Sequence, residues 1–256
     1  MKTTLLIDGD IIAYQQAAQA EVPIEWAEDF WTLHADAREA KDRIDHWLKT
    51  VQETLGADEV KVCVSDGQNF RKELNPTYKA HRTKTRKPMI LGELKEHLIY
   101  HHKARLEPRL EADDIISILA TSSPGDEKRV MVSTDKDFNT VPGWHYNWNK
   151  PELGVTEVSL LQADWYFMSQ TLTGDTTDGY PGCKGVGPVA AQKILGEANK
   201  TIQELWSRVL AAYAKAGFGE EEALMQARMA RLLRRGDYST KTKRITLWNP
   251  SPSISN

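Results

Sequence analysis

The chain has 256 residues, of which 40% are hydrophobic, and a formal net charge of −3. This length fits one large domain or two small lobes, and its apolar runs are too short to cross a membrane. Cys63 and Cys183 lie far apart without metal-ligand spacing, which argues against a disulfide framework or a zinc site. The N-terminus lacks the pattern of an export signal, so we expect a cytoplasmic protein.

Three short β-type runs lead directly into acidic residues. They are 3–7 before Asp8, 60–64 before Asp66, and 130–132 before Asp135 and Asp137. If these runs are parallel strands of one sheet, their carboxyl ends lie at one edge, where open α/β folds place their sites. The acids are therefore expected to converge there. Two further short strands are expected within 144–148 and 153–158.

Helical periodicity accounts for much of the remaining chain. The expected helices span 11–20, 24–55, 160–172, 189–195, 202–215 and 220–235. Trp26, Trp31 and Trp47 of the long second helix are expected to pack in the core or between lobes rather than to stack on bases. The last residues, 251–256, are expected to be frayed.

Residues 70–110 hold eleven Lys or Arg against four acids, although the whole chain is slightly acidic. Tyr78, Lys79 and Arg82 crowd together in this segment, and Pro88 follows them. A solvated charged face would explain this composition, but such uneven polarity favours a mobile basic clamp on a phosphate backbone. The segment therefore indicates a nucleic-acid partner.

Further acids gather in two other places. Glu111, Asp113 and Asp114 precede an apolar helical run, and three acids in four positions exceed what a helix dipole needs. Asp175 and Asp178 lie in a turn rich in Gly and Thr, which suits a hard divalent cation.

Nine acids thus stand at the ends of expected elements. They are Asp8, Asp66, Glu111, Asp113, Asp114, Asp135, Asp137, Asp175 and Asp178. Like charges in close proximity raise one another's pKa unless cations neutralise them. Oxygen ligands without His or Cys favour Mg²⁺ or Mn²⁺ over Zn²⁺, and so many carboxylates suggest two ions about 4 Å apart, as in two-metal phosphodiester sites.

A glycine-rich turn follows the last of these acids. The residues Gly-Cys-Lys-Gly-Val-Gly at 182–187 precede a helix that begins near Pro188. The free backbone N–H groups of such a turn suit a phosphate. A cation site beside a phosphate site is what hydrolysis of a nucleic-acid backbone requires.

The order of these segments resembles the flap endonuclease/5′–3′ exonuclease superfamily. The matching stretches are Asp8-Gly9, Asp66 with FRKELNPTYKAHR (70–82), EADDII (111–116), STDKDF (133–138) and GDTTDGYPGCKGVG (174–187). The stretch QARMARLLRRGDYSTKTKRITLW (226–248) is similar to the short exonuclease branch of T-odd lytic phages. Each motif is weak by itself, but five in the family's order are specific.

The resemblance implies an α/β fold with a PIN-like, mostly parallel central sheet flanked by helices. Residues 1–172 would form the nuclease core, with a basic helical arch at about 70–106, and 173–256 a helix-hairpin-helix and C-terminal helical subdomain. The implied function is a metal-dependent 5′–3′ exonuclease or structure-specific 5′ nuclease in phage DNA replication, primer removal or host DNA degradation. Its partners would be duplex DNA with a 5′ end, gap or flap and RNA–DNA hybrids, and the protein would be a monomer.

The resemblance also implies roles for individual residues. Asp8, Asp66, Glu111, Asp113 and Asp114 would hold, directly or through water, the ion that activates the attacking water. Asp135, Asp137, Asp175 and Asp178 would serve the ion on the leaving-group side. Asp8, Asp66, Lys79 and Arg82 are the expected catalytic residues. The expected DNA contacts are Arg71, Tyr78, Lys79, Arg82, Lys84, Lys193 and the glycines Gly182, Gly185 and Gly187. A monovalent cation is a further expectation at the 182–187 turn.

Two positions depart from the family pattern. After Gly187 the family has Lys-Thr or Lys-Ser, whereas this chain continues with Pro-Val. The change removes a hydroxyl and a cation from the DNA anchor, and Lys184 or Lys193 would have to compensate for them. Asp10 stands where cellular members commonly have a small residue, and either a supporting or a structural role is open.

Two other functions are compatible with parts of the sequence. An Asp-Gly-Asp triplet after a strand also fits a haloacid-type phosphatase with Asp8 as covalent nucleophile, although the basic arch and 174–187 would then have no role. A non-catalytic DNA-binding protein would keep the scaffold but is expected to lose acids, and none is missing. A phosphoryl-aspartate trapped at Asp8 would support the first alternative, and binding without Mg²⁺-stimulated cleavage the second.

Overall fold

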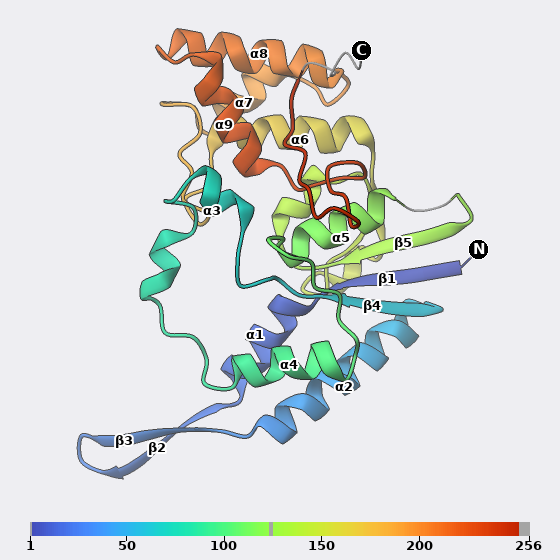
Figure 1. The fold of residues 1–256 in the computed structure, drawn as a ribbon, viewed down its shortest axis with the longest axis vertical. Helices are drawn as coiled ribbons and strands as arrows, with labels where there is room; N and C mark the ends of the chain where they lie inside the picture. The colour runs from blue at the N-terminus through green and yellow to red at the C-terminus, as the bar shows by residue number, and fades with distance from the viewer. Residues whose placement is uncertain (1, 123–124, 251–256) are drawn as a thin grey trace.

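A five-stranded sheet lies at the centre of the computed structural model, which describes residues 2–122 and 125–250 (Figure 1). Its strands are β1 (Lys2–Asp8), β4 (Glu59–Cys63), β5 (Glu127–Val132), β6 (Gly143–Tyr146) and β7 (Thr156–Val158), in the order β4-β1-β5-β6-β7. All neighbouring strands are parallel except β6 and β7. The carboxyl ends of β4, β1 and β5 therefore meet at one edge, as expected from the sequence.

Helices cover both faces of this sheet. They are α1 (Gly9–Gln19), α2 (Ala37–Thr54), α3 (Phe70–Leu74), α4 (Leu91–Tyr100), α5 (Ala112–Thr121), α6 (Leu160–Thr173), α7 (Pro188–Leu195), α8 (Ile202–Lys215) and α9 (Glu220–Ala230), with the 3-10 helices η1 (Ala80–Lys84), η2 (Lys136–Thr140) and η3 (Pro151–Leu153). Because side chains alternate along a strand, Leu5 and Ile7 of β1 pack with α1, α2 and α4, whereas Leu6 packs with α5. The expected α/β class with a mostly parallel central sheet is confirmed.

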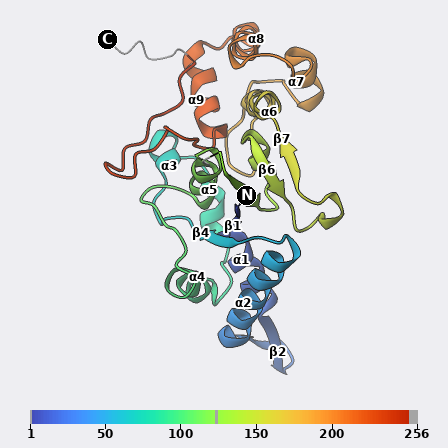
Figure 2. The same cartoon turned by 90° about the vertical axis from the view of Figure 1, so that its right-hand side faces the viewer.

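The helices α6 to α9 gather at one end of the molecule (Figures 1 and 2). Their shared core contains Phe167 of α6, Leu195 of α7 and Trp206 of α8. Since α6 also contacts η2, it joins this helical part to the sheet. The domain boundary expected between residues 172 and 173 stays a prediction.

The C-terminal part of the chain differs in two details from the expected helices. The helix expected over 220–235 ends at Ala230, and the following residues, including Leu233 and Tyr238, are buried against α5. Residues 251–256, which we expect to be frayed, lie outside the described residues. In the part of the chain that the structure describes, no helix is long and apolar enough to cross a membrane.

The prediction of one long helix over 24–55 is wrong for the residues before Ala37. β2 (Glu21–Ala27) and β3 (Phe30–Ala35) form an antiparallel hairpin that projects from the rest of the molecule (Figures 1 and 2). The helix α2 begins at Ala37, where the side chain of Asp36 caps it. Trp26 and Trp31 are 64% and 54% exposed on the hairpin, so their expected place in the core is also wrong.

The basic arch expected at about 70–106 is shorter than the resemblance implies. Leu94 and Leu98 of α4 are fully buried against α1 and α2, so this helix belongs to the core. Lys95 of the same helix pairs with Asp10 at 2.8 Å instead of facing a partner. The connection that leaves the body between α3 and α4 spans 75–90 and contains η1 (Figure 1).

Candidate active site

Asp8 lies at the carboxyl end of β1, at the edge where the sequence places the acids. Its Oδ1 accepts a hydrogen bond from the backbone N–H of Ile11 at 3.2 Å, and its Oδ2 accepts one from Ser133 Oγ at 2.9 Å. The carboxylate is buried, and this burial together with the charges of Asp10 and Asp135 raises its pKa to about 7. A proton or a cation is therefore needed to neutralise Asp8 near neutral pH.

The first turn of α5 brings a second acid to the same place. Burial of Asp113 and then the charges of Asp8, Asp135 and Glu111 raise its pKa well above the usual range. These interactions join β1, β5 and α5 in one electrostatic cluster, which matches the convergence that the strand order predicts.

The acids after β5 extend this cluster toward α6. Asp135 caps η2 by accepting a hydrogen bond from the backbone N–H of Asp137 at 2.9 Å. Asp137 accepts another from Gln170 Nε2 at 2.5 Å. Burial, followed by the charges of Asp135 and Asp178, raises the pKa of Asp137 to about 7. Gln170 is a polar neighbour that no sequence motif indicated.

The acidic turn between α6 and α7 completes the cluster. Asp175 accepts a hydrogen bond from the backbone N–H of Thr177 at 2.7 Å and pairs with Lys136 Nζ at 2.7 Å. Burial acts to raise the pKa of Asp175, but Lys136 and the turn's N–H groups outweigh it and lower that pKa. Lys136 is a site residue that sequence reasoning missed, although it stands inside the STDKDF motif.

Two cations of the basic segment point at these acids. Lys79 Nζ lies 2.7 Å from Glu111 Oε1 and 3.5 Å from Asp178 Oδ2, and Arg82 Nη2 lies 3.0 Å from Asp178 Oδ1. Burial opposes ionisation of Glu111, but Lys79 and the nearby guanidinium of Arg71 lower its pKa to about 2. Lys79 has a φ of +52°, a conformation that few residues with a side chain adopt, and its backbone N–H donates to the carbonyl of Asp178 at 2.8 Å.

Two of the expected DNA contacts are buried. Tyr78 is 2% exposed, and its hydroxyl lies 2.9 Å from Glu111 Oε2 and 3.1 Å from Asp178 Oδ2. Arg71 is 1% exposed and forms hydrogen bonds of 2.7 and 2.8 Å to the carboxylate of Asp114. The expectation that Tyr78 and Arg71 touch DNA is wrong, because neither can reach the surface. The carboxylate of Asp114 is occupied by Arg71, and its expected role at the metal, directly or through water, stays a prediction.

Asp66 and Asp10 both accept hydrogen bonds from backbone N–H groups. The carboxylate of Asp66 accepts hydrogen bonds from the backbone N–H groups of Gly67 and Arg109, both at 2.8 Å. Asp10 lies close enough to Asp8 for its charge to raise the pKa of Asp8. Asp10 also accepts a hydrogen bond from the N–H of Ser65 at 2.9 Å. Asp10 is therefore a further acid beside Asp8, and the role of Asp66 as a metal ligand stays a prediction.

The spacing and donor set of the clustered acids fit hydrated divalent ions. Within the described residues, no three of these acids bring their oxygens within 4.8 Å of one another. Mg²⁺ keeps several water molecules, so its carboxylate ligands do not need to touch. The cluster offers only oxygen ligands. Burial, followed by the negative charges of neighbouring acids, raises the pKa values of Asp8, Asp113 and Asp137.

The glycine-rich turn is built by close approach of two backbones. A Cβ on Gly182 would lie 2.3 Å from the backbone nitrogen of Gly174, and both glycines have a φ of +67°. The N–H of Gly182 is buried and donates to Gln226 Oε1 at 3.0 Å, so the expectation that it faces a phosphate is wrong. Gly185 and Gly187 are exposed, which is compatible with the expected contact.

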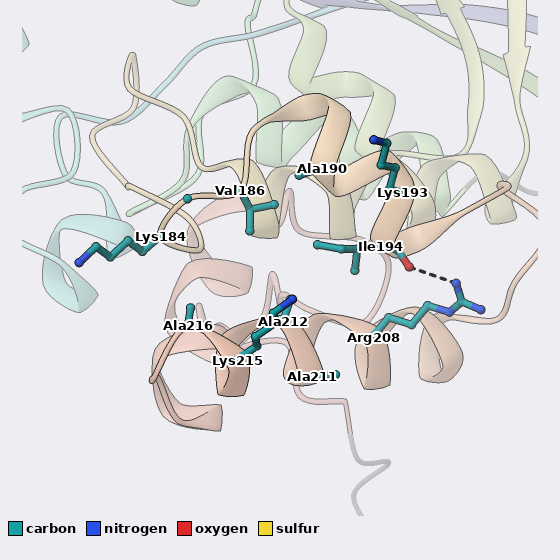
Figure 3. Close-up of a pocket in the computed structure, with 11 residues that line it drawn as sticks. Lys184, Val186, Ala190, Lys193, Ile194, Arg208, Ala211, Ala212, Lys215 and Ala216 are labelled. Carbon is teal, nitrogen blue, oxygen red and sulfur yellow. Dashed lines mark hydrogen bonds between the residues drawn. The ribbon is translucent and has the colours of Figure 1, made fainter.

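A cavity of about 670 Å³ opens beside this turn, between α7 and α8 (Figure 3). Its lining combines apolar side chains, such as Val186 and Ile194, with cations. The cations are Lys184, Lys193, Arg208 and Lys215. Arg208 donates a hydrogen bond to the carbonyl of Ile194 at 3.0 Å and so caps α7, whereas Lys184 and Lys193 are exposed. Both cations that would have to compensate for the missing Lys-Thr pair thus lie around one cavity.

Known proteins resemble this chain in sequence, and others resemble it in fold. Residues 3–157 match the model of the 5′-3′ exonuclease N-terminal resolvase-like domain. The chain is 32% identical to an exodeoxyribonuclease of Enterobacteria phage T3, over 97% of this chain and 93% of the relative. It is 31% identical to an exonuclease of Escherichia phage T7, over 97% of this chain and 94% of the relative.

Solved structures of bacteriophage T5 proteins share the fold at low sequence identity. A T5 flap endonuclease, solved with DNA and metal ions, has a TM-score of 0.64 and 16% identity over 90% of this chain and 89% of that chain. A T5 5′-exonuclease solved with zinc has a TM-score of 0.60 and 14% identity over 90% of both chains.

The PIN-like sheet, the matching family model and the phage relatives define a nuclease. The family model covers more than half of the chain, and the phage relatives cover nearly all of it. The chain therefore belongs to the 5′–3′ exonuclease family, within the flap endonuclease superfamily.

Proposed function

We propose that this nuclease is a Mg²⁺-dependent 5′–3′ exonuclease and structure-specific 5′ nuclease that hydrolyses phosphodiester bonds of duplex DNA. One observation carries the proposal: Asp8, Asp113 and Asp137 have raised pKa values at one sheet edge, beside the cations Lys79 and Arg82. The names of the phage T3 and T7 relatives, and the DNA and metal ions in the T5 flap endonuclease structure, support it.

The clustered acids would hold two divalent ions. Asp8, Asp66, Glu111, Asp113 and Asp114 would serve one ion, directly or through water, and Asp135, Asp137, Asp175 and Asp178 would serve the other. When bound, such ions supply an activated water and neutralise the phosphate. Mg²⁺ or Mn²⁺ fits an oxygen-only donor set better than softer metals do.

Lys79 and Arg82 would act on the phosphate itself. Both now neutralise acids of the cluster, Glu111 and Asp178. A scissile phosphate between the ions would compete for the same cations, which would then stabilise the negative charge that gathers on its oxygens. Because these contacts go to the backbone, they would read no base sequence.

The glycine-rich turn would hold the duplex away from the cut. Exposed Gly185 and Gly187, with Lys184 and Lys193, would contact phosphates, and a monovalent cation could share the turn. Lys84, exposed at the end of η1, would extend the contact toward a 5′ end, gap or flap. We further propose that RNA–DNA hybrids are substrates and that the protein acts as a monomer in the host cytoplasm.

Membership of the exonuclease family removes the haloacid-type alternative, and a non-catalytic role is tested by cleavage itself. Duplex, flap and hybrid substrates labelled at either end should be incubated with Mg²⁺ or with chelator. Short products released from the 5′ end with Mg²⁺ alone would support the proposal. Binding without cleavage under every condition would leave only the non-catalytic function.

Asp135→Asn provides a matched test of the metal assignment. The variant keeps the shape of the side chain but loses a charge that acts on Asp8, Asp113 and Asp137. We expect cleavage to be lost and duplex binding to persist, because the basic surface is unchanged. Near-normal cleavage by this variant would contradict the assignment.

A further inference from the structure

A histidine-rich cluster lies away from the sheet edge, where α4 packs against α2. Asp45 comes from α2, His97 from α4, and His102 from the residues just after α4. Asp45 Oδ1 is 2.6 Å from both His97 Nε2 and His102 Nε2. Of the side chains in 2–122 and 125–250, this is the one group of three His, Cys, Asp or Glu whose ligand atoms all lie within 4.8 Å of one another.

The exposure and packing of these side chains suit a bound ion. Asp45, His97 and His102 are 37%, 13% and 22% exposed, so each is held by the protein yet open on one side. The open side provides an entry path and room for a water ligand. The ring of His101 stacks on that of His97 at 4.9 Å and meets that of His102 edge-on at 5.0 Å, which restricts how both imidazoles can turn.

The chemistry of the three ligands selects zinc. Two imidazoles and a carboxylate with one water complete the tetrahedral set that Zn²⁺ takes in open sites. Zinc–ligand bonds of about 2.0–2.2 Å would place the ligand atoms about 3.3 Å apart, so the present contacts need to widen by less than about 1 Å. Small side-chain rotations supply such a shift. Imidazole ligands favour Zn²⁺ here, whereas the oxygen-only sheet edge favours Mg²⁺ or Mn²⁺.

We propose that Asp45, His97 and His102 form a second metal site, which binds Zn²⁺ and ties α4 to α2. The site lies outside the acidic cluster, and its three protein ligands would link two helices and leave the fourth position to water. The helix α4 directly follows the connection 75–90, which carries Lys79 and Arg82. Zinc bound at α4 would therefore anchor one end of this connection. The cysteine pattern argues against a zinc site, but these ligands come from His and Asp on separate elements.

Metal retention tests this proposal directly. The full chain is treated with chelator, loaded with Zn²⁺ in a large excess of Mg²⁺ to occupy the carboxylate edge, and passed through a desalting column. We expect about one equivalent of zinc by emission spectrometry and a rise of roughly 5 °C in melting temperature. Co²⁺ in place of Zn²⁺ should give the strong visible absorption of a four-coordinate site with nitrogen ligands, which six-coordinate oxygen sites lack.

Ligand variants and a neighbour provide the comparison. His97→Asn, His102→Asn and Asp45→Asn should each lose zinc retention and the melting shift. The Asn side chain of Asp45→Asn can still accept hydrogen bonds from the histidines, so this variant is expected to stay folded. Circular dichroism checks that each variant is folded. His46→Asn is the matched control on α2, since the His46 ring lies outside the cluster, 3.5 Å from the hydroxyl of Thr50, and the variant should retain zinc. Zinc retained equally by wild type and ligand variants, or by neither, would show that the cluster is a hydrogen-bonded contact alone.

Discussion

The guanidinium of Arg71 donates two hydrogen bonds, of 2.7 and 2.8 Å, to the carboxylate of Asp114 in the interior of the protein. Arg71 also donates to the backbone carbonyls of Met229 and Arg231 at the end of α9, at 3.3 and 2.6 Å. Asp114 accepts a further hydrogen bond from the N–H of Leu233 at 3.1 Å. The pair therefore joins α3 and α5 to the C-terminal segment.

Arg71→Ala is predicted to destabilise the protein rather than to weaken DNA binding. Removal of one partner leaves the other charge buried without compensation, which costs about 3–5 kcal/mol. Urea denaturation measures this loss, and Lys72→Ala, at the adjacent exposed position, should cost far less. A small loss of stability with a large loss of duplex affinity would instead place Arg71 on the DNA.

Lys79→Ala is predicted to slow the chemical step more than it weakens binding. Loss of one positioned donor at a developing charge costs a factor of about 10²–10³ in rate. Single-turnover cleavage and equilibrium binding of the same duplex separate the two effects. Lys84→Ala, in the same segment but exposed, should act on binding alone. Equal losses in rate and affinity for Lys79→Ala would show that Lys79 contributes to DNA binding and not to the chemical step.

Without divalent ions, the protein is predicted to lose stability as the pH rises from about 5 to 8. Asp8 and Asp137, both with a pKa of about 7, bind protons more tightly when folded than when unfolded. Their contribution to stability is therefore complete below the ordinary Asp pKa and is lost as the pH passes through 7. The melting temperature in chelator should fall across this range, and Mg²⁺ should restore it at the upper end.

Asp8→Asn tests this effect, because it removes one of the carboxyls whose pKa is raised in the folded protein. His145, whose pKa is lowered by burial, acts in the opposite direction, but it is common to both proteins. Glu111, with a pKa of about 2, stays ionised throughout the range. The melting temperature of Asp8→Asn should fall less steeply with pH than that of wild type. Identical slopes would contradict the raised pKa of Asp8.

Lys193→Ala is predicted to reduce the salt dependence of duplex binding. Each phosphate contact contributes about 0.9 to the slope of log affinity against log salt, so the slope should fall by about that amount. The measurement is a titration at several salt concentrations, with Lys49→Ala on the distant helix α2 as control. An unchanged slope would mean that the cavity beside the glycine-rich turn does not face the DNA.

Part of the hairpin was visible in the sequence. Val22, Ile24 and Trp26 alternate with polar residues, and Pro23 disfavours a helix interior. The helical pattern from Ile44 onward is strong, and it hides this alternation when a single helix is expected over 24–55. The sequence therefore contains a strand pattern at residues 22–26, but this pattern does not show where the strand ends and the following helix begins.

The sequence by itself determined the nuclease family, the order of the sheet's acidic strand ends and the helices of the C-terminal part. These features are encoded locally, in apolar runs of period two or 3.6 and in motifs whose order along the chain is specific. Only the tertiary structure decided which charged residues face each other. In the folded protein Arg71 pairs with buried Asp114, Asp10 lies beside Asp8, and Asp45 contacts two histidines. A local sequence pattern contains no information about which of these positions lie close together in space.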